Sequence, residues 1–96
     1  MPAGPSALVP WHVTVEMSGD VRDQALDALA VESLVDVLID YRPMISHLPR
    51  KWTVRLTIWS ETPLAAGEEG IEVVTKAAAE ASLPSWPVSR IEVARQ

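Results

Sequence analysis

The feature that most constrains this chain is a ten-residue stretch of strict alternation, KWTVRLTIWS, at residues 51–60. Apolar side chains occupy every second position, beginning with Trp52, while a second tryptophan, Trp59, falls on the polar side. A period of two is typical of a strand that buries one face and leaves the other open. We therefore expect a sheet with one covered face, and Trp59 on the other face as either a loop-covered ring or a contact residue.

Three other stretches also indicate strands. Residues 11–17 (WHVTVEM) and 88–96 (VSRIEVARQ) both alternate between apolar and polar side chains. Residues 44–48 (MISHL) form a short apolar stretch, separated from 51–60 by a proline and an arginine. So short a link predicts that these two neighbours form an antiparallel hairpin.

Residues 21–41 show helical periodicity with a change of phase. By the helical wheel, the apolar positions of the first half lie about 160° from those of the second half. A straight helix would expose one of the two patches. We therefore expect a helix that begins after an Asp20 cap and ends before Pro43. A break, kink or π-bulge is expected near residues 30–33, where Ser33 is a candidate second cap.

Residues 64–82 predict a second helix. One side collects small and apolar residues, and the other collects glutamates with one lysine, Lys76. Thr62 is placed to cap its first turn, and Pro63 suits the first helical position.

The resulting order is β-α-β-β-α-β, which predicts an α+β fold of the ferredoxin-like type, a two-layer sandwich. Right-handed crossovers set the antiparallel sheet order as fourth, first, third, second (4-1-3-2), with both helices on one face. Residues 1–10 contain three prolines, so we expect an extended N-terminal arm followed by a single domain over 11–96.

Composition disfavours several functions. The formal charge is −5, which argues against nucleic acid and anionic membrane surfaces as partners. The chain has no cysteine, so it has neither disulfides nor thiolate chemistry. The two histidines, His12 and His47, show no metal-ligand spacing, and we expect no metal and no cofactor. The N-terminus lacks the pattern of a secretory signal or an anchor, so a cytoplasmic setting is expected.

The candidate interaction residues lie on the polar side of the predicted strands. They are Trp59, Arg55, Thr57, His12, Thr14 and Arg90. The simplest interpretation of the arginines is cross-strand pairing with Glu16 and Glu92. The alternative is a clamp for a carboxylate or phosphate group.

These residues favour a small non-enzymatic interaction or regulatory module that associates with itself or with a protein partner through the uncovered sheet face. The alternative is a small-molecule sensor or a cofactor-free enzyme of the dimeric ferredoxin-like type, with a pocket near His12, Arg55 and Trp59. An acylphosphatase-like site needs an asparagine, which the chain lacks. An RNA-recognition module needs aromatic residues at mid-strand positions of its open sheet face, and the corresponding positions of the predicted strands are not aromatic. The acidic helix faces are either solvated surfaces or sites for a basic partner.

The residue usage adds one resemblance. The chain has no Phe and no Asn, and arginine outnumbers lysine six to two, which indicates a GC-rich coding sequence. In this respect and in its predicted layout, the chain resembles small uncharacterised proteins of high-GC actinobacteria and their phages. The resemblance implies no site residue.

Overall fold

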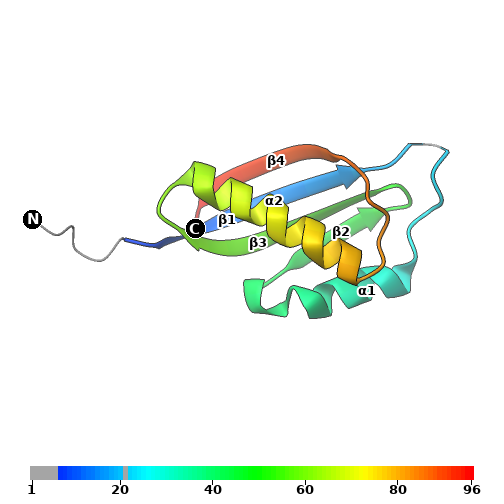
Figure 1. The fold of residues 1–96 in the computed structure, drawn as a ribbon, viewed down its shortest axis with the longest axis horizontal. Helices are drawn as coiled ribbons and strands as arrows, with labels where there is room; N and C mark the ends of the chain where they lie inside the picture. Colours follow the sequence, from blue (N-terminus) through cyan, green and yellow to red (C-terminus); the bar gives the residue numbers. More distant parts are fainter. Residues whose placement is uncertain (1–6, 21) are drawn as a thin grey trace, which may run out of the picture.

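In the computed structural model, which describes residues 7–20 and 22–96, the chain forms one four-stranded antiparallel sheet with two helices packed on it (Figure 1). The elements in order are β1 (Val9–Ser18), α1 (Ala28–Val37), the 3-10 turn η1 (Ile39–Tyr41), β2 (Met44–Leu48), β3 (Lys51–Ser60), α2 (Pro63–Glu80) and β4 (Val88–Arg95). The strand order β2-β3-β1-β4 is the predicted order counted from the other edge, which confirms it. The α+β class is confirmed, and the layout is compatible with a ferredoxin-like fold.

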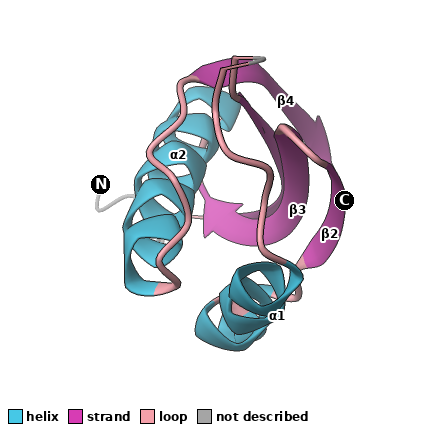
Figure 2. Cartoon of the chain, turned by 90° about the vertical axis from the view of Figure 1, so that its right-hand side faces the viewer, coloured by secondary structure: helices cyan, strands magenta, loops and turns pink. Residues whose placement is uncertain are grey.

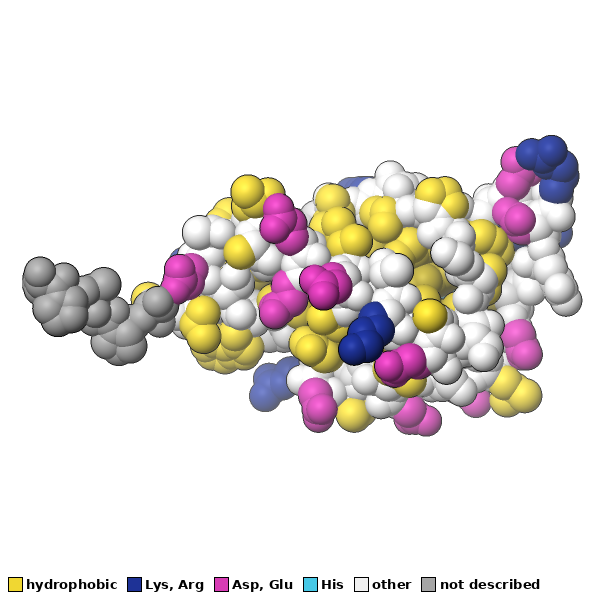
Figure 3. Space-filling view, viewed as in Figure 1, with side chains coloured by type: hydrophobic (Ala, Val, Ile, Leu, Met, Phe, Trp, Pro, Cys, Tyr) yellow, Lys and Arg dark blue, Asp and Glu magenta, His cyan; other side chains and the backbone are white. Residues whose placement is uncertain are grey.

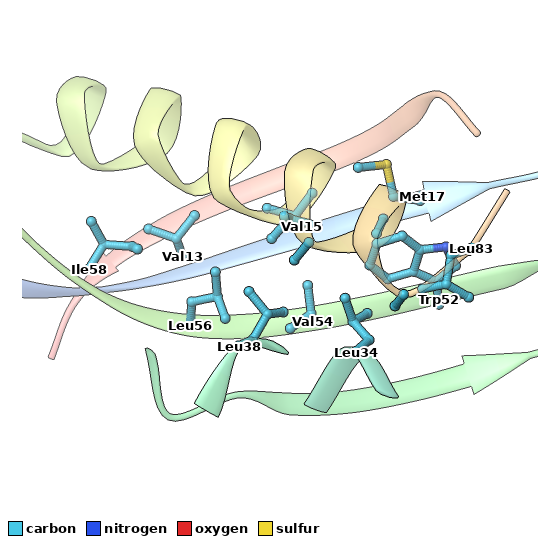
Figure 4. Close-up of a cluster of buried hydrophobic side chains, with 14 of the residues drawn as sticks. Val13, Val15, Met17, Leu34, Leu38, Trp52, Val54, Leu56, Ile58 and Leu83 are labelled. Carbon is cyan, nitrogen blue, oxygen red and sulfur yellow. The ribbon is translucent and has the colours of Figure 1, made fainter. Parts of the chain in front are cut away.

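Both helices lie on the same side of the curved sheet, as Figure 2 shows. The apolar positions of the alternating strands point towards them and form the core (Figure 4). Its fully buried side chains are Val13 and Val15 of β1, Trp52, Val54, Leu56 and Ile58 of β3, Val74 of α2, and Leu34 and Leu38 from the α1 region. Among the described residues, no helix lies over the opposite sheet face.

Glycine brings α2 close to the sheet. A Cβ atom on Gly70 would lie 2.5 Å from Cγ1 of Val13, so the helix backbone sits directly on β1. The first turn of α2 is capped as predicted, because the Thr62 hydroxyl accepts a hydrogen bond from Ala65 N–H (3.1 Å).

The hairpin prediction is also confirmed. β2 and β3 pair antiparallel, and Leu48 lies opposite Lys51 across a two-residue turn. This turn anchors the segment that follows β1. Gly19 N–H donates to Arg50 O (2.8 Å), and Leu26 N–H donates to Pro49 O (2.8 Å).

The prediction for the first helix is wrong in two respects. Residues 22–27 are not helical, and α1 runs from Ala28 through residues 30–33 without a break, so Ser33 caps nothing. Its N-cap is Asp27, whose side chain accepts from Leu29 N–H (3.0 Å), while Asp20 accepts from Arg22 N–H in a turn.

The phase change is resolved by burying one patch and exposing the other. Of the first apolar patch, Ala25 and Ala28 are exposed and Leu29 is 71% exposed, whereas Leu34 and Leu38 of the second patch are buried. The helix therefore starts late and turns its second patch to the core, while Leu26 packs against the core from an irregular segment.

The helix also ends earlier than residue 41, because α1 stops at Val37 and the 3-10 turn η1 continues to Tyr41. Arg42, in a left-handed conformation (φ 53°), ends this turn just before Pro43, where the sequence predicted the helical stretch to end.

The predicted arm overlaps β1. Residues 1–6 lie outside the described residues, but Val9 and Pro10, which the sequence assigned to the arm, are the first two residues of β1.

Candidate functional site

The strand register collects the predicted interaction residues on the sheet face that neither helix covers, called the outer face below. Thr14 lies directly opposite Arg55, and His12 lies directly opposite Thr57. Arg90 of β4 pairs with Glu16 of β1, which alternates with the buried valines. The structure thus places all six residues on one face, including Trp59, which follows the inward-facing Ile58.

Trp59 is the most conspicuous side chain of the outer face. It lies opposite Pro10 near one end of the sheet and is 60% exposed. Of the two alternatives for this residue, the loop-covered ring does not fit this exposure. Trp59 therefore presents open aromatic surface beside Thr57, which is half-buried.

Two further apolar residues of the outer face were missed by the sequence analysis. Met44, opposite Arg55, is 61% exposed, and Leu48, opposite Lys51, is 59% exposed. The signal was present in the hairpin, because a two-residue turn fixes the cross-strand partners of β2. Taken alone, MISHL does not alternate, and only its register with β3 shows which of its side chains lie on the outer face.

The charged residues of the outer face differ in how they are paired. Arg90 forms an ion pair with Glu92, and Lys51 approaches Glu16 at 3.9 Å. Within residues 7–20 and 22–96, Arg55 has no carboxylate at ion-pair distance, and its guanidinium contacts the sulfur of Met44. Among the described residues, the cross-strand ion pair is Lys51–Glu16, whereas Arg90 and Glu92 pair within β4 and Arg55 stays open. Cross-strand pairing therefore accounts for neither arginine.

A depression of about 270 Å³ adjoins Arg55 on the outer face. It is lined by Thr14, Met44, Ile45, Ser46, Thr53 and Arg55. His12 and Trp59 do not line it, so the depression does not unite the residues for which the sequence predicted a ligand pocket.

The histidines lie apart. His12 is on the outer face of β1, whereas His47 pairs with Trp52 and so lies on the helix side of β2. Among the described residues, no group of three His, Cys, Asp or Glu side chains could hold a metal ion.

The helix side of the molecule is acidic. Carboxylates gather over α2 (Figure 3), where Lys76 is the one basic residue of the helix. A groove of about 320 Å³ runs between the end of α1, η1 and α2, with Leu38 and Val73 inside it and Glu69, Glu72 and Glu80 along it. Lys76 also lines this groove. A basic partner for the acidic helix faces stays a prediction.

In comparisons with protein-family models, curated proteins and solved structures, none matches this chain. The resemblance to actinobacterial and phage proteins therefore stays a prediction. In the part of the chain that the structure describes, no helix has the length and apolar character needed to cross a membrane.

Proposed function

We propose that this chain is a small non-enzymatic module of the ferredoxin-like type that self-associates through its outer face. One observation carries the proposal. Trp59, Met44 and Leu48 each expose about 60% of their surface on a sheet face that no helix covers. Aromatic residues and methionine are enriched in protein interfaces, and tryptophan is frequent among the residues that dominate binding energy.

Charge favours a second copy of the chain as the partner. The outer face carries Lys51, Arg55 and Arg90 against Glu16 and Glu92, so it is nearly neutral. The whole chain has a formal charge of −5, and most of its acidic residues lie elsewhere. Two outer faces therefore meet without strong like-charge repulsion, whereas two helix sides would repel each other.

Paired and unpaired charges can complement each other in such a dimer. Arg55 has no carboxylate partner within the described residues of its own chain. Glu92, which pairs with Arg90 through one oxygen, lies on the same face, one strand beyond Thr14. In a symmetric interface the same patch is used twice, so each copy offers its open guanidinium to the other copy's carboxylates.

The size of the face predicts a weak dimer. Strands about 4.8 Å apart with about 3.4 Å per residue give four strands of this length a flat area of roughly 500 Å². Two copies would then bury roughly 1,000 Å², which is the lower limit for a specific interface. We therefore expect association in the micromolar range and not an obligate dimer.

Sedimentation equilibrium of Trp59→Ala tests the proposal. The variant is expected to weaken self-association by at least about tenfold, because a large aromatic contact is lost from both copies. Stability should change by less than about 1 kcal/mol, since the ring is already largely exposed. Leu64→Ala is the matched control, because Leu64 is 73% exposed on α2, away from the outer face.

Equal dimerisation constants for the wild type and Trp59→Ala would contradict the proposal, as would an equal loss in Leu64→Ala. A wild type that stays monomeric would favour the second candidate, a small-molecule sensor or cofactor-free enzyme. One observation supports that candidate: Arg55, open to an anionic group, lines the depression of about 270 Å³.

A further inference from the structure

The indole nitrogen of Trp52 is buried without a hydrogen-bond partner. Trp52 is 1% exposed, and its Nε1 is the one such unpartnered side-chain atom within residues 7–20 and 22–96. The other strongly buried tryptophan, Trp11, donates its N–H to the carbonyl of Ser60 (3.0 Å). A buried donor is normally satisfied, and residues 7–20 and 22–96 offer no acceptor to the N–H of Trp52.

A pocket of about 130 Å³ adjoins this indole. It lies between the last residues of β1, the first residues of β3 and the C-terminal part of α2. Apolar groups from Met17, Leu83 and Trp86 form much of its wall, and Figure 4 shows Met17 and Leu83 beside the ring of Trp52. Thr75, exposed on α2, adds a hydroxyl group to the lining.

The wall formed by residues 83–86 is held in place by the backbone geometry at the end of α2. Leu83 N–H donates to Ala78 O (2.9 Å), and Ser82 N–H donates to Ala79 O (3.2 Å) with Ser82 in a left-handed conformation (φ 61°). This is the Schellman pattern that ends a helix and directs the residue after it back onto the helix. The pocket is therefore shaped by the end of α2.

Trp86 forms the other part of this wall. Its indole ring rests on Gly19, where a Cβ atom would overlap the ring. The irregular segment that leads into β4 is tied to β1 in the same region, because Ser18 N–H donates to Pro87 O (3.2 Å). Glycine at position 19 thus lets the ring lie flat against the backbone and border the pocket.

We propose that this pocket binds a small, mostly apolar molecule that carries one hydrogen-bond acceptor, with a cyclic ketone as the model compound. An apolar cavity of about 150 Å³ holds a benzene ring, so a pocket of about 130 Å³ fits a single small ring. The ring contacts Met17, Leu83 and Trp86, and the acceptor oxygen receives the N–H of Trp52. The pocket lies on the helix side of the sheet, so this proposal does not depend on self-association.

Titration of the ¹⁵N-labelled chain with cyclohexanone tests the proposal through the indole N–H signals. The Trp52 signal is expected to move downfield and to saturate, because its proton gains an acceptor. Methylenecyclohexane has the same shape without the oxygen. It is expected to bind about tenfold more weakly, since it leaves the buried donor unpaired.

Three variants sharpen the result. Trp52→Phe removes the donor and should lower cyclohexanone affinity about tenfold, to that of methylenecyclohexane. Leu64→Ala, at an exposed position of α2 that does not line the pocket, should leave the affinity unchanged. Ala79→Leu places a larger side chain at an exposed position of α2 that lines the pocket, and should block both compounds without disturbing the core.

Equal affinity for the two compounds, or an unmoved Trp52 signal up to the solubility limit of the ketone, would overturn the proposal. The same holds if the Trp52 proton shows contact with water alone throughout the titration. If Trp52→Phe does not fold, Ala79→Leu decides the matter: a lost response supports the pocket, and an unchanged response rejects it.

Discussion

At the scale of single residues, two glycines of α2 show how closely the helix is fitted to the sheet. A Cβ on Gly70 would lie 2.5 Å from Val13, which is fully buried in a central strand and has no room to move. A Cβ on Gly67 would lie 3.3 Å from Val93 and 3.6 Å from Ile91, both on the edge strand β4. The same substitution should therefore have opposite effects at the two positions.

We predict that Gly70→Ala lowers the free energy of unfolding by about 1–3 kcal/mol, because overpacking of a tight core outweighs the gain in helix propensity. Gly67→Ala should raise it by up to about 1 kcal/mol, since the edge strand can shift and alanine favours the helix. Urea unfolding of both variants measures the difference. Similar shifts in the same direction would show that α2 is not seated on Val13.

Residue-level patterns also explain which outer-face residues could be predicted. Strict alternation in 11–17 and 51–60 is enough to assign Thr14, Arg55 and Trp59 to one face. Met44 needed one more step, because MISHL does not alternate and its faces follow from the register with β3. The pocket beside Trp52 could not be predicted, since it depends on how residues 82–86 return over the sheet.

At the scale of elements, α1 is where local pattern and tertiary structure disagree. The change of apolar phase between residues 21–29 and 34–41 was a sound sign that no straight helix fits. The pattern did not indicate which half of the stretch would be non-helical. Hydrogen bonds to the β2–β3 turn settle this, because Arg50 donates to Asp23 O (2.8 Å) and Pro49 O accepts from Leu26. These contacts hold residues 23–26 out of a helix.

This account of α1 predicts that Asp27→Ala destabilises the protein by about 1 kcal/mol, because the side chain that caps Leu29 N–H is lost. Asp36→Ala, an exposed carboxylate in the same helix, is the control and should change stability by less than about 0.5 kcal/mol. Thermal or urea unfolding gives both values. An Asp27→Ala variant as stable as the control would mean that α1 begins elsewhere.

At the scale of the whole molecule, the two sides of the sheet differ in chemistry. The helix side is acidic and covered, whereas the outer face is nearly neutral and carries exposed apolar side chains. Trp59, Met44 and Leu48 are exposed at separate positions along this face, with Leu48 beside Lys51 and Trp59 towards the other end of β3. Tryptophan and methionine are enriched in protein interfaces. This asymmetry is the basis for proposing that two outer faces pack together.

The most direct test of this claim is a dilution series of the ¹⁵N-labelled wild-type chain, followed by NMR from high to low micromolar concentration. We predict that the indole signal of Trp59 and the amide signals of β1 and β3 shift together with concentration, whereas those of α1 and α2 do not. Signals that stay fixed throughout, or shifts confined to the acidic helices, would contradict self-association through the outer face.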